Sequence, residues 1–352
     1  MARHRPGIAL CQGFYADVVA GMLAPWRHEA ALLGWGSDVL GYDTARSTDH
    51  GFGPRLLVFG AAADLDPMRA ALDRGLPDRY GGHPVRFGWD DVPVAHHVGV
   101  HDLSGWLTGQ LGATPGPGLS TMDWLATPQQ RLLGVVRGAV FADPDGRLRS
   151  IRGALGWYPD DLWRWLLACQ WRRIEQEESF AGRTAELGDD LGARLLVGRL
   201  GTEVMRLAFL YERRYRPYQK WLGTAFSKLA IAPMLQPVLH AAVRAGDAAE
   251  REGALVAAYE TMARRHNDSG LTEPIDPTAR RFHSRPYRVI GADRFAGALR
   301  ATVSARWLRS LPPIGSVDQW ADSTDVLDGP AGTPTRAVYA ALGGRPPGSS
   351  AL

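Results

Sequence analysis

A Gly-Ser pair and an aspartate further along the chain are the residues of this sequence best placed to do chemistry. Gly36 and Ser37 follow a short apolar run, and Asp49 comes after eleven intervening residues. Glycine lets a ligand approach the backbone, and a serine hydroxyl with free amide groups holds a phosphate. A carboxylate beside such a turn supplies the hard oxygen ligand that Mg²⁺ prefers. This pattern predicts a pocket for a magnesium-bound nucleoside triphosphate.

Other polar residues of the same stretch are candidates to complete that pocket. His50 is a metal ligand or a general base in one interpretation, and a hydrogen-bonded loop histidine in the other. Arg55 begins the next apolar run, where it would bind a phosphate through two parallel hydrogen bonds or pair with Asp49 and hold the loop. Since one or two carboxylates usually hold Mg²⁺, a second acid is needed. The spacing of the residues does not distinguish among three candidates for this second acid, which are Asp38, Asp43 and Asp102.

A basic segment in the second half of the chain is a further candidate for phosphate binding. Arg214, Tyr218 and Lys220 fall near the predicted start of a helix, where cationic groups suit a triphosphate. The chain has only two lysines, Lys220 and Lys228, which makes Lys220 the best single candidate for offsetting phosphate charge. A solvated basic turn is the alternative.

Paired carboxylates also occur at helical spacing. Glu175 and Glu178 lie three residues apart, so they would share one face of a helix. A catalytic base for an acceptor is one interpretation, and a salt-bridged helix surface is the one that we favour. Asp189 and Asp190 precede the next apolar run and are expected to cap its helix.

The elements that must position these residues change character along the chain. A helix is predicted up to Pro25, because apolar residues recur there at helical spacing. Alternation of strand and helix patterns over roughly the next 90 residues indicates a small mixed α/β domain. The expected strands are 30–36, 55–60, 83–89 and 96–103, and the expected helices are 64–76 and a short one around Trp106.

The rest of the chain is predicted to be mainly helical. A segment rich in Gly, Pro and Ser, 111–120, is typical of a linker, and the turn at 144–146 indicates a small hairpin or strand-turn unit. Helices are expected at 159–180, 188–213, 217–231, 234–245, 246–266 and 292–309. We therefore expect an α+β protein with an α/β domain at 1–115, a larger helical domain at 120–330 and a poorly ordered tail at 331–352.

Composition narrows the function classes. The 40 basic and 37 acidic residues give a net charge of +3, which argues against a dedicated nucleic-acid binder. Two cysteines cannot form a disulfide framework, so a reducing cytoplasm is the expected location. The sequence contains no run of about 18 apolar residues, so no membrane span is predicted.

The spacing of Gly36-Ser37, Asp49 and the following apolar run resembles that of the polymerase-beta-type nucleotidyltransferase superfamily. The likeness is closer to a bacterial family described only as a nucleotidyltransferase-like domain of unknown function, and it extends over nearly the whole chain. The segments that carry it are GSDVLGYDTARSTDHGFGPRLLVF (36–59), GRTAELGDDLGARLLVGRL (182–200), RYRPYQKWLGTAFSKL (214–229), RRHNDSGLT (264–272), HSRPYRVI (283–290) and GSVDQWADSTDVL (315–327).

The resemblance implies an enzyme that moves a nucleoside monophosphate from a nucleoside triphosphate, most simply ATP, to a small acceptor hydroxyl or amine. Mg²⁺ would be held by Asp49 with Asp38 or Asp102, and the acceptor would lie between the two domains. The superfamily has a second acid two residues after the first, but this chain has Gly51 there. The alternative is therefore a non-catalytic nucleotide-binding or regulatory module with a degenerate metal site.

Overall fold

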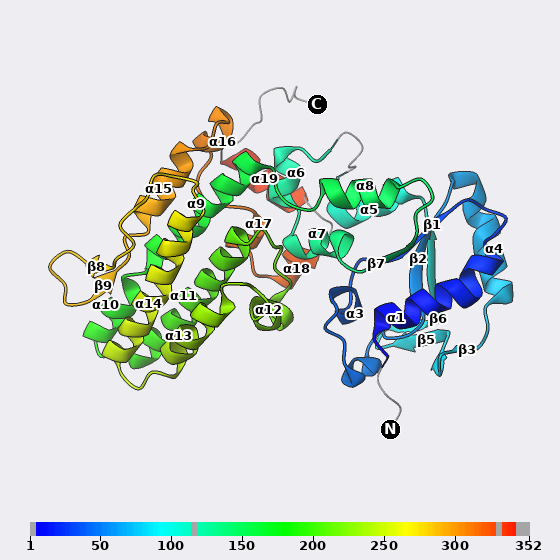
Figure 1. Ribbon diagram of the computed structural model, residues 1–352, viewed down its shortest axis with the longest axis horizontal. Coiled ribbons are helices and arrows are strands. Elements are labelled where there is room, and N and C mark those ends of the chain that lie inside the picture. The colour runs from blue at the N-terminus through cyan, green and yellow to red at the C-terminus, as the bar shows by residue number, and fades with distance from the viewer. Residues whose placement is uncertain (1–4, 114–117, 329–332, 343–352) are drawn as a thin grey trace. The chain divides into compact units, whose positions relative to one another are not determined.

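The computed structural model describes residues 5–113, 118–328 and 333–342 as an α+β protein with a small mixed sheet and a larger helical part (Figure 1). Two compact units can be distinguished in it. The described residues of the first unit include those up to 123 and those at 127–156. Those of the second unit include 124–126, 157–327 and 334–342.

The first unit is built on a five-stranded sheet with the order β5-β6-β2-β1-β7. Only β2 and β6 are parallel, with Arg55 opposite His97 and Phe59 opposite His101. A crossover that includes helix α4 (Leu65–Gly75) joins these two strands, as a parallel pair requires. The strands are β1 (Glu29–Leu32), β2 (Arg55–Phe59), β5 (Arg86–Trp89), β6 (Val92–His101) and β7 (Ala139–Ala142), with a separate hairpin of β3 (Arg79–Tyr80) and β4 (His83–Pro84).

Helices bury the apolar side chains of this sheet. The N-terminal helix runs as α1 (Gly7–Phe14), a π-helical turn (Tyr15–Val19) and α2 (Ala20–Met22), and with α4 (Leu65–Gly75) it packs on the sheet (Figure 1). Phe14, Met68 and Val58 meet in this core and have no exposed surface. The remaining helices of the unit are α3 (Ser37–Leu40), α5 (Leu103–Leu111), α7 (Gln129–Val136) and α8 (Arg147–Ala154).

Strand β7 belongs to the first unit, which was not predicted from the sequence. Residues 139–142 follow the predicted linker and were expected to lie in a small hairpin or strand-turn unit. In the structure they pair with β1 at the edge of the sheet, and residues 127–156 belong to the first unit. A four-residue strand carries no local signal for its partner, because pairing is decided by tertiary contacts.

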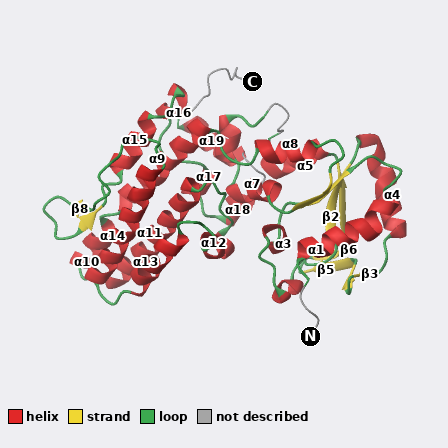
Figure 2. Cartoon of the chain, viewed as in Figure 1, coloured by secondary structure: helices red, strands yellow, loops and turns green. Residues whose placement is uncertain are grey.

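The second unit consists mostly of helices, with one small hairpin of β8 (Arg280–Arg281) and β9 (Arg288–Val289) (Figure 2). Its longest helices are α9, α11 and α14. The helices are α9 (Asp160–Glu177), α10 (Phe180–Glu186), α11 (Asp190–Tyr211), α12 (Gln219–Phe226), α13 (Ala232–Arg244), α14 (Ala248–Asp268), α15 (Asp293–Ala301), α16 (Arg306–Ser310), α17 (Val317–Trp320), α18 (Thr324–Asp328) and α19 (Thr333–Ala341), and the residues of α6 (Thr121–Ala126) are divided between the two units.

Aromatic side chains form much of the core of the second unit. Trp165 and Trp171 are fully buried, and the Trp171 indole stacks on Phe295 with ring centroids 4.6 Å apart. The Trp171 indole nitrogen donates a hydrogen bond to the Tyr211 hydroxyl. A large aromatic side chain with a satisfied polar atom suits such a core.

Three remaining expectations concern caps, the tail and the membrane. Asp189 caps α11 as predicted, accepting a hydrogen bond from the Gly192 amide at 2.8 Å. Within the expected disordered tail, α19 forms a helix, and residues 331, 332 and 343–352 lie outside the described part of the chain. Among the described helices, none is sufficiently long and apolar to traverse a bilayer.

Candidate functional site

The loop between β1 and β2 carries most of the predicted site residues. It leaves β1 through Gly34 and Gly36, whose φ angles of 94° and 121° are open to glycine but not to other residues. Ser37 then begins the four-residue helix α3. A 3₁₀ helix (Ala45–Asp49), capped by the Thr44 hydroxyl, ends at the predicted metal ligand. The chain thus turns sharply at each of the positions that the sequence singled out.

Asp38 and Arg55 form a buried ion pair inside this loop. The guanidinium donates from Nη2 to Asp38 Oδ1 at 2.6 Å and from Nε to Oδ2 at 3.2 Å. The exposed fractions of the two side chains are 4% for Asp38 and 8% for Arg55. Asp38 Oδ1 also accepts a hydrogen bond from the Val39 amide. The pair is bidentate and largely shielded from water, which is the strong form of this interaction.

This ion pair corrects two predictions. Arg55 does not pair with Asp49, and its guanidinium also donates to the Trp35 carbonyl at 2.7 Å, so it has little capacity left for a phosphate. Both oxygens of Asp38 are engaged, so Asp38 is not a free ligand for Mg²⁺. The two residues instead hold the start of α3 against the start of β2.

Asp102 lies at the wrong end of the sheet to share a metal with Asp49. Because β2 and β6 are parallel, His97 lies beside Arg55 and His101 lies beside Phe59. Asp102 follows His101, so it lies about 16 Å along the strands from the Arg55 end of β2, which is the end that the Asp49 loop enters. Its carboxylate caps α5 by accepting a hydrogen bond from the Gly105 amide at 2.6 Å. The prediction that Asp102 is a metal ligand is therefore not supported by its position.

Tryptophan rings lie against the position of the second acid. Gly51 has a φ of 63°, and a Cβ atom there would lie 3.0 Å from Trp35 Cη2 and 3.4 Å from Trp89 Cε2. An aspartate at this position would have to shift the Trp35 ring by a few tenths of an ångström. Across the described residues, no three Asp, Glu, His or Cys side chains gather as a metal site. The residues present do not fit the carboxylate cluster that the resemblance implies.

We call the rings around Gly51 the aromatic cluster, which consists of Trp35, His50, Phe87, Trp89 and His97. Trp35 is 52% exposed and its ring lies 5.5 Å from that of Trp89. The Arg55 guanidinium lies over the Trp35 ring at 4.5 Å. Burial lowers the pKa of His97, whose Nε2 donates to the Phe87 carbonyl. His50 pairs with Asp90 at 3.1 Å, and both side chains are mostly exposed.

Ser37 and Asp49 are the loop residues that keep free polar groups. The Ser37 hydroxyl makes no hydrogen bond to any described residue, and Asp49 is exposed and unpaired within the same part of the chain. Asp43, the third candidate for the second acid, accepts a hydrogen bond from the Gly7 amide at 2.8 Å. Asp49 is thus the one predicted acid of this loop that is left for a ligand.

The predicted basic residues of the second unit lie where the sequence placed them. Tyr218 is the N-cap residue of α12 and Lys220 is in its first turn. Lys220 and Arg214 are exposed, and the Lys220 ammonium lies 5.2 Å from the centre of the Trp221 ring. Glu175 pairs with Arg172 on the surface of α9, as predicted. Glu178 differs, because it is only 6% exposed.

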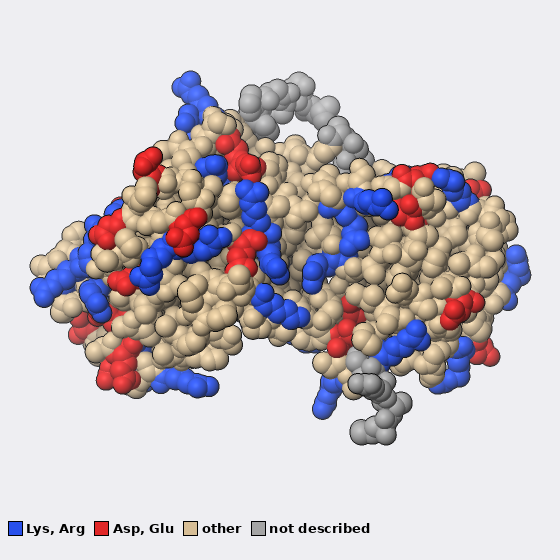
Figure 3. Space-filling view, in the orientation of Figure 1, with Lys and Arg blue, Asp and Glu red and all other residues tan. Residues whose placement is uncertain are grey.

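Both charge signs occur over the face of the molecule shown in Figure 3, where basic and acidic side chains are interspersed. Trp35 and Trp89 are parts of the site that were not predicted from the sequence. The position of Trp35 between two glycines and directly before Ser37 is a signal that could have drawn attention to it.

Comparison with known proteins gives two similarities. Residues 124–222 match a family described as a domain of unknown function, DUF4037, and this match lies beyond the Ser37–Asp49 loop. The chain is also similar to the crystal structure of a nucleotidyltransferase-like protein from Exiguobacterium sibiricum, with 14% identity, a TM-score of 0.33, and coverage of 78% of this chain and 82% of that one. No curated protein matches the chain. Neither similarity identifies a reaction.

Proposed function

We propose that the first unit binds a nucleoside triphosphate at the aromatic cluster and Ser37 and does not transfer it. The observation that carries this proposal is the packing of Gly51 against Trp35 and Trp89, where a catalytic site of this kind would need a second carboxylate. The same packing supplies an aromatic surface in place of an acid. The loop is therefore better suited to holding a nucleotide than to activating its phosphate.

The ring of Trp35 provides the binding surface for the base. It is half exposed, and Arg55 fixes it both by lying over the ring and by binding the Trp35 carbonyl. A base stacked on an aromatic side chain contributes about 1–3 kcal/mol. The free Ser37 hydroxyl, two residues along the chain, is available to donate to a phosphate oxygen.

Mg²⁺ is proposed to bind together with the nucleotide. Mg²⁺ commonly keeps several waters and binds through phosphates and one or two carboxylates. Asp49 is the exposed carboxylate of the loop that could contribute one oxygen, while Asp38 is held by Arg55.

Nucleotidyl transfer to a small acceptor is the second candidate function, and one observation favours it. Asp49 is exposed and has no partner among the described residues, as a metal-binding carboxylate would be before its ligand arrives. In this candidate, Asp49 would ligate Mg²⁺ and His50 would act beside it, although His50 now pairs with Asp90.

The test combines binding and transfer with the same labelled nucleotide. ATP labelled at the α-phosphate is incubated with the protein and Mg²⁺ and a set of small hydroxyl and amine acceptors, and retained and transferred label are measured. We expect retained label that is lost with Trp35→Ala, and no transferred label. Transfer by the wild type that disappears with Asp49→Ala would contradict the proposal and support the transferase.

A variant at position 51 sharpens this test. Gly51→Asp supplies the second carboxylate and keeps the Trp35 ring, which has to shift by only a few tenths of an ångström. Transfer by Gly51→Asp, but not by the wild type, would show that the missing carboxylate separates binding from catalysis. Trp26→Ala is the matched control for Trp35→Ala, because Trp26 packs against the core of the first unit and is not part of the aromatic cluster.

A further inference from the structure

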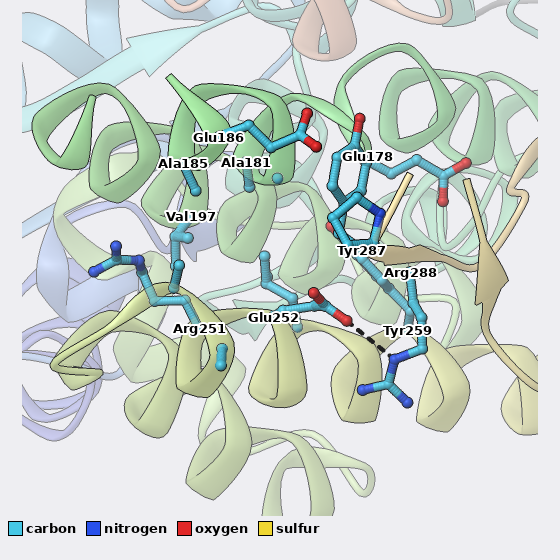
Figure 4. Close-up of a pocket in the computed structure, with 15 residues that line it drawn as sticks. Glu178, Ala181, Ala185, Glu186, Val197, Arg251, Glu252, Tyr259, Tyr287 and Arg288 are labelled. Atoms are coloured by element: carbon cyan, nitrogen blue, oxygen red, sulfur yellow. Dashed lines mark hydrogen bonds and ion pairs between the residues drawn. The ribbon is translucent and has the colours of Figure 1, made fainter. Parts of the chain in front are cut away.

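A cavity of about 320 Å³ lies entirely within the second unit, apart from every residue of the proposed nucleotide site. Helices α10 and α14 form two of its walls, α11 contributes Val197, and the segment 286–288 closes a third side (Figure 4). A cavity of this size is within the range of sites that hold small molecules. It has no role in the site that the sequence pointed to.

Small apolar side chains line much of this cavity. Ala181 and Ala185 come from α10, Ala248 and Leu255 come from α14, and Val197 comes from α11. Alanines at facing positions leave the space that larger side chains would fill, because protein interiors are otherwise close-packed. The cavity therefore suits a ligand with an apolar body.

Two carboxylates reach toward the space between the helices from opposite sides. Figure 4 shows Glu186 extending from α10 and Glu252 extending from α14. Glu186 pairs with Arg285 and Glu252 pairs with Arg288, each at 3.0 Å. The arginine side chains are 56% and 47% exposed, whereas the glutamates are 29% and 27% exposed. Such exposed pairs are weak, so a ligand cation can replace either arginine.

Two other charged side chains, Arg251 and Glu178, line the cavity. Arg251 is buried, its Nη2 binds Asp190 at 2.6 Å, a carboxylate that Arg194 also binds, and its Nη1 has no hydrogen-bond partner among the described residues. Glu178 also lines the cavity and accepts hydrogen bonds from the amides of residues 290–292. Tyr287 is 5% exposed, and its hydroxyl has no hydrogen-bond partner among the described residues. That hydroxyl oxygen can accept a bond from an ammonium group.

We propose that this cavity binds a small organic cation, an amine with an apolar body, between Glu186 and Glu252. The ammonium group is attracted by both carboxylates, and the apolar body packs against the alanines of α10 and α14. An anion of the same shape is repelled by the two glutamates. A neutral analogue gains the apolar contact but leaves the carboxylates with the exposed arginines.

Three probes of similar shape test the sign of the charge. Phenethylamine is the cation, 2-phenylethanol is neutral and 3-phenylpropanoate is the anion, and isothermal titration of the full chain measures the affinity for each. We expect the amine to bind at least about tenfold more tightly than the other two, the difference that loss of one charge-assisted hydrogen bond gives. Equal binding of the alcohol, tighter binding of the carboxylate, or no binding of the amine would each overturn the proposal.

Charge-removing variants locate the cation. Glu186→Gln and Glu252→Gln are each expected to weaken amine binding by about tenfold, with melting temperatures close to that of the wild type. Glu175→Gln is the matched control, because Glu175 is 26% exposed, pairs with one arginine and lies outside the cavity. An amine affinity that falls equally in the control, or that is unchanged in both cavity variants, would contradict the assignment.

A blocking variant tests the cavity without altering its charge. Ala185→Phe places an aromatic ring in the space lined by α10, α11 and α14, and we expect amine binding to be lost. Retained affinity in this variant, with the protein shown to be folded by its circular dichroism, would place the amine elsewhere. The nucleotide-binding assay of the first unit is a separate readout, and neither result depends on the other.

Discussion

The loop of the first unit and the cavity of the second unit both pair aspartate or glutamate with arginine, but they differ in burial. Asp38 and Arg55 are 4% and 8% exposed, and their atoms are committed to one another. The pairs Glu186–Arg285 and Glu252–Arg288 keep between 27% and 56% of their side chains exposed. Burial, more than the distance between the charges, therefore decides whether an ion pair is structural or open to a ligand.

The physical reason lies in desolvation. An exposed pair contributes about 0.2–1 kcal/mol, because water and ions screen it. Breaking a buried pair costs about 3–5 kcal/mol, because the remaining charge has lost its water without keeping its partner. Arg55 is therefore expected to act on the site by positioning Asp38 and Trp35, whereas the arginines beside the cavity are replaceable.

The largest effect is expected from Arg55→Ala. It leaves Asp38 buried without a counter-charge, and we expect the free energy of unfolding to fall by about 3–5 kcal/mol. Urea denaturation measures this loss. Arg27→Ala is the matched control in the same unit, since the Arg27–Asp145 pair is exposed, and it should change stability by less than about 1 kcal/mol. Similar losses in both variants would break the comparison.

Glu178→Gln is expected to have the next largest effect, seen in the pH dependence of stability. Burial raises the pKa of Glu178 from 4.5 to about 7, although three backbone amides donate to it. The folded state therefore holds this proton more tightly than the unfolded state. The contribution of Glu178 to the free energy of unfolding is at its full value below about pH 4.5. It declines by up to about 3 kcal/mol as the pH rises toward 7.

The measurement for Glu178 is a difference between two proteins. Thermal unfolding of the wild type and of Glu178→Gln is followed from pH 4 to pH 8, and the wild type should lose stability relative to the variant over that range. Glu175→Gln should run parallel to the wild type. A constant difference between wild type and Glu178→Gln at all pH values would show that the pKa of Glu178 is ordinary.

Gly51→Asp is expected to cost about 1–2 kcal/mol in the first unit, since a residue with a side chain is strained at positive φ. The new side chain also presses on the Trp35 ring. Combining it with Trp35→Ala should recover part of the loss, because only the steric component depends on the ring. A double variant as unstable as the sum of the two single variants would show that the ring and position 51 do not interact.

The smallest effect is expected from Arg285→Ala. Removing this exposed arginine frees the Glu186 carboxylate, so phenethylamine should bind a few-fold more tightly while stability changes by less than about 1 kcal/mol. Titration and thermal unfolding of the same preparation measure both quantities. Weaker amine binding in this variant would mean that the arginine is part of the binding surface.

The regular elements could be predicted because their signals are local. The apolar spacing that predicted helix 188–213 is found as α11 (Asp190–Tyr211), and the apolar run that predicted strand 55–60 is found as β2. The helix capped by Asp189 also needed only neighbouring residues. Such features depend on residues within a few positions of one another.

The site could not be predicted to the same extent, because its contacts join distant residues. The partner of Asp38 is 17 residues away, and the parallel pairing of β2 with β6 decides that Asp102 falls at the far end of the sheet. Trp89 lies on strand β5 and contacts the loop at Gly51. Residue types and spacing identified the loop, but they did not reveal which of its acids were already engaged.

The affinity of the intact protein for ATP, with and without Trp35, tests the central claim most directly. Isothermal titration in Mg²⁺ buffer should give binding by the wild type and affinity at least about tenfold weaker for Trp35→Ala, from the loss of one stacked base. Trp26→Ala should bind as the wild type does. If Trp35→Ala binds ATP as tightly as the wild type, the aromatic cluster is not the nucleotide site and the account fails.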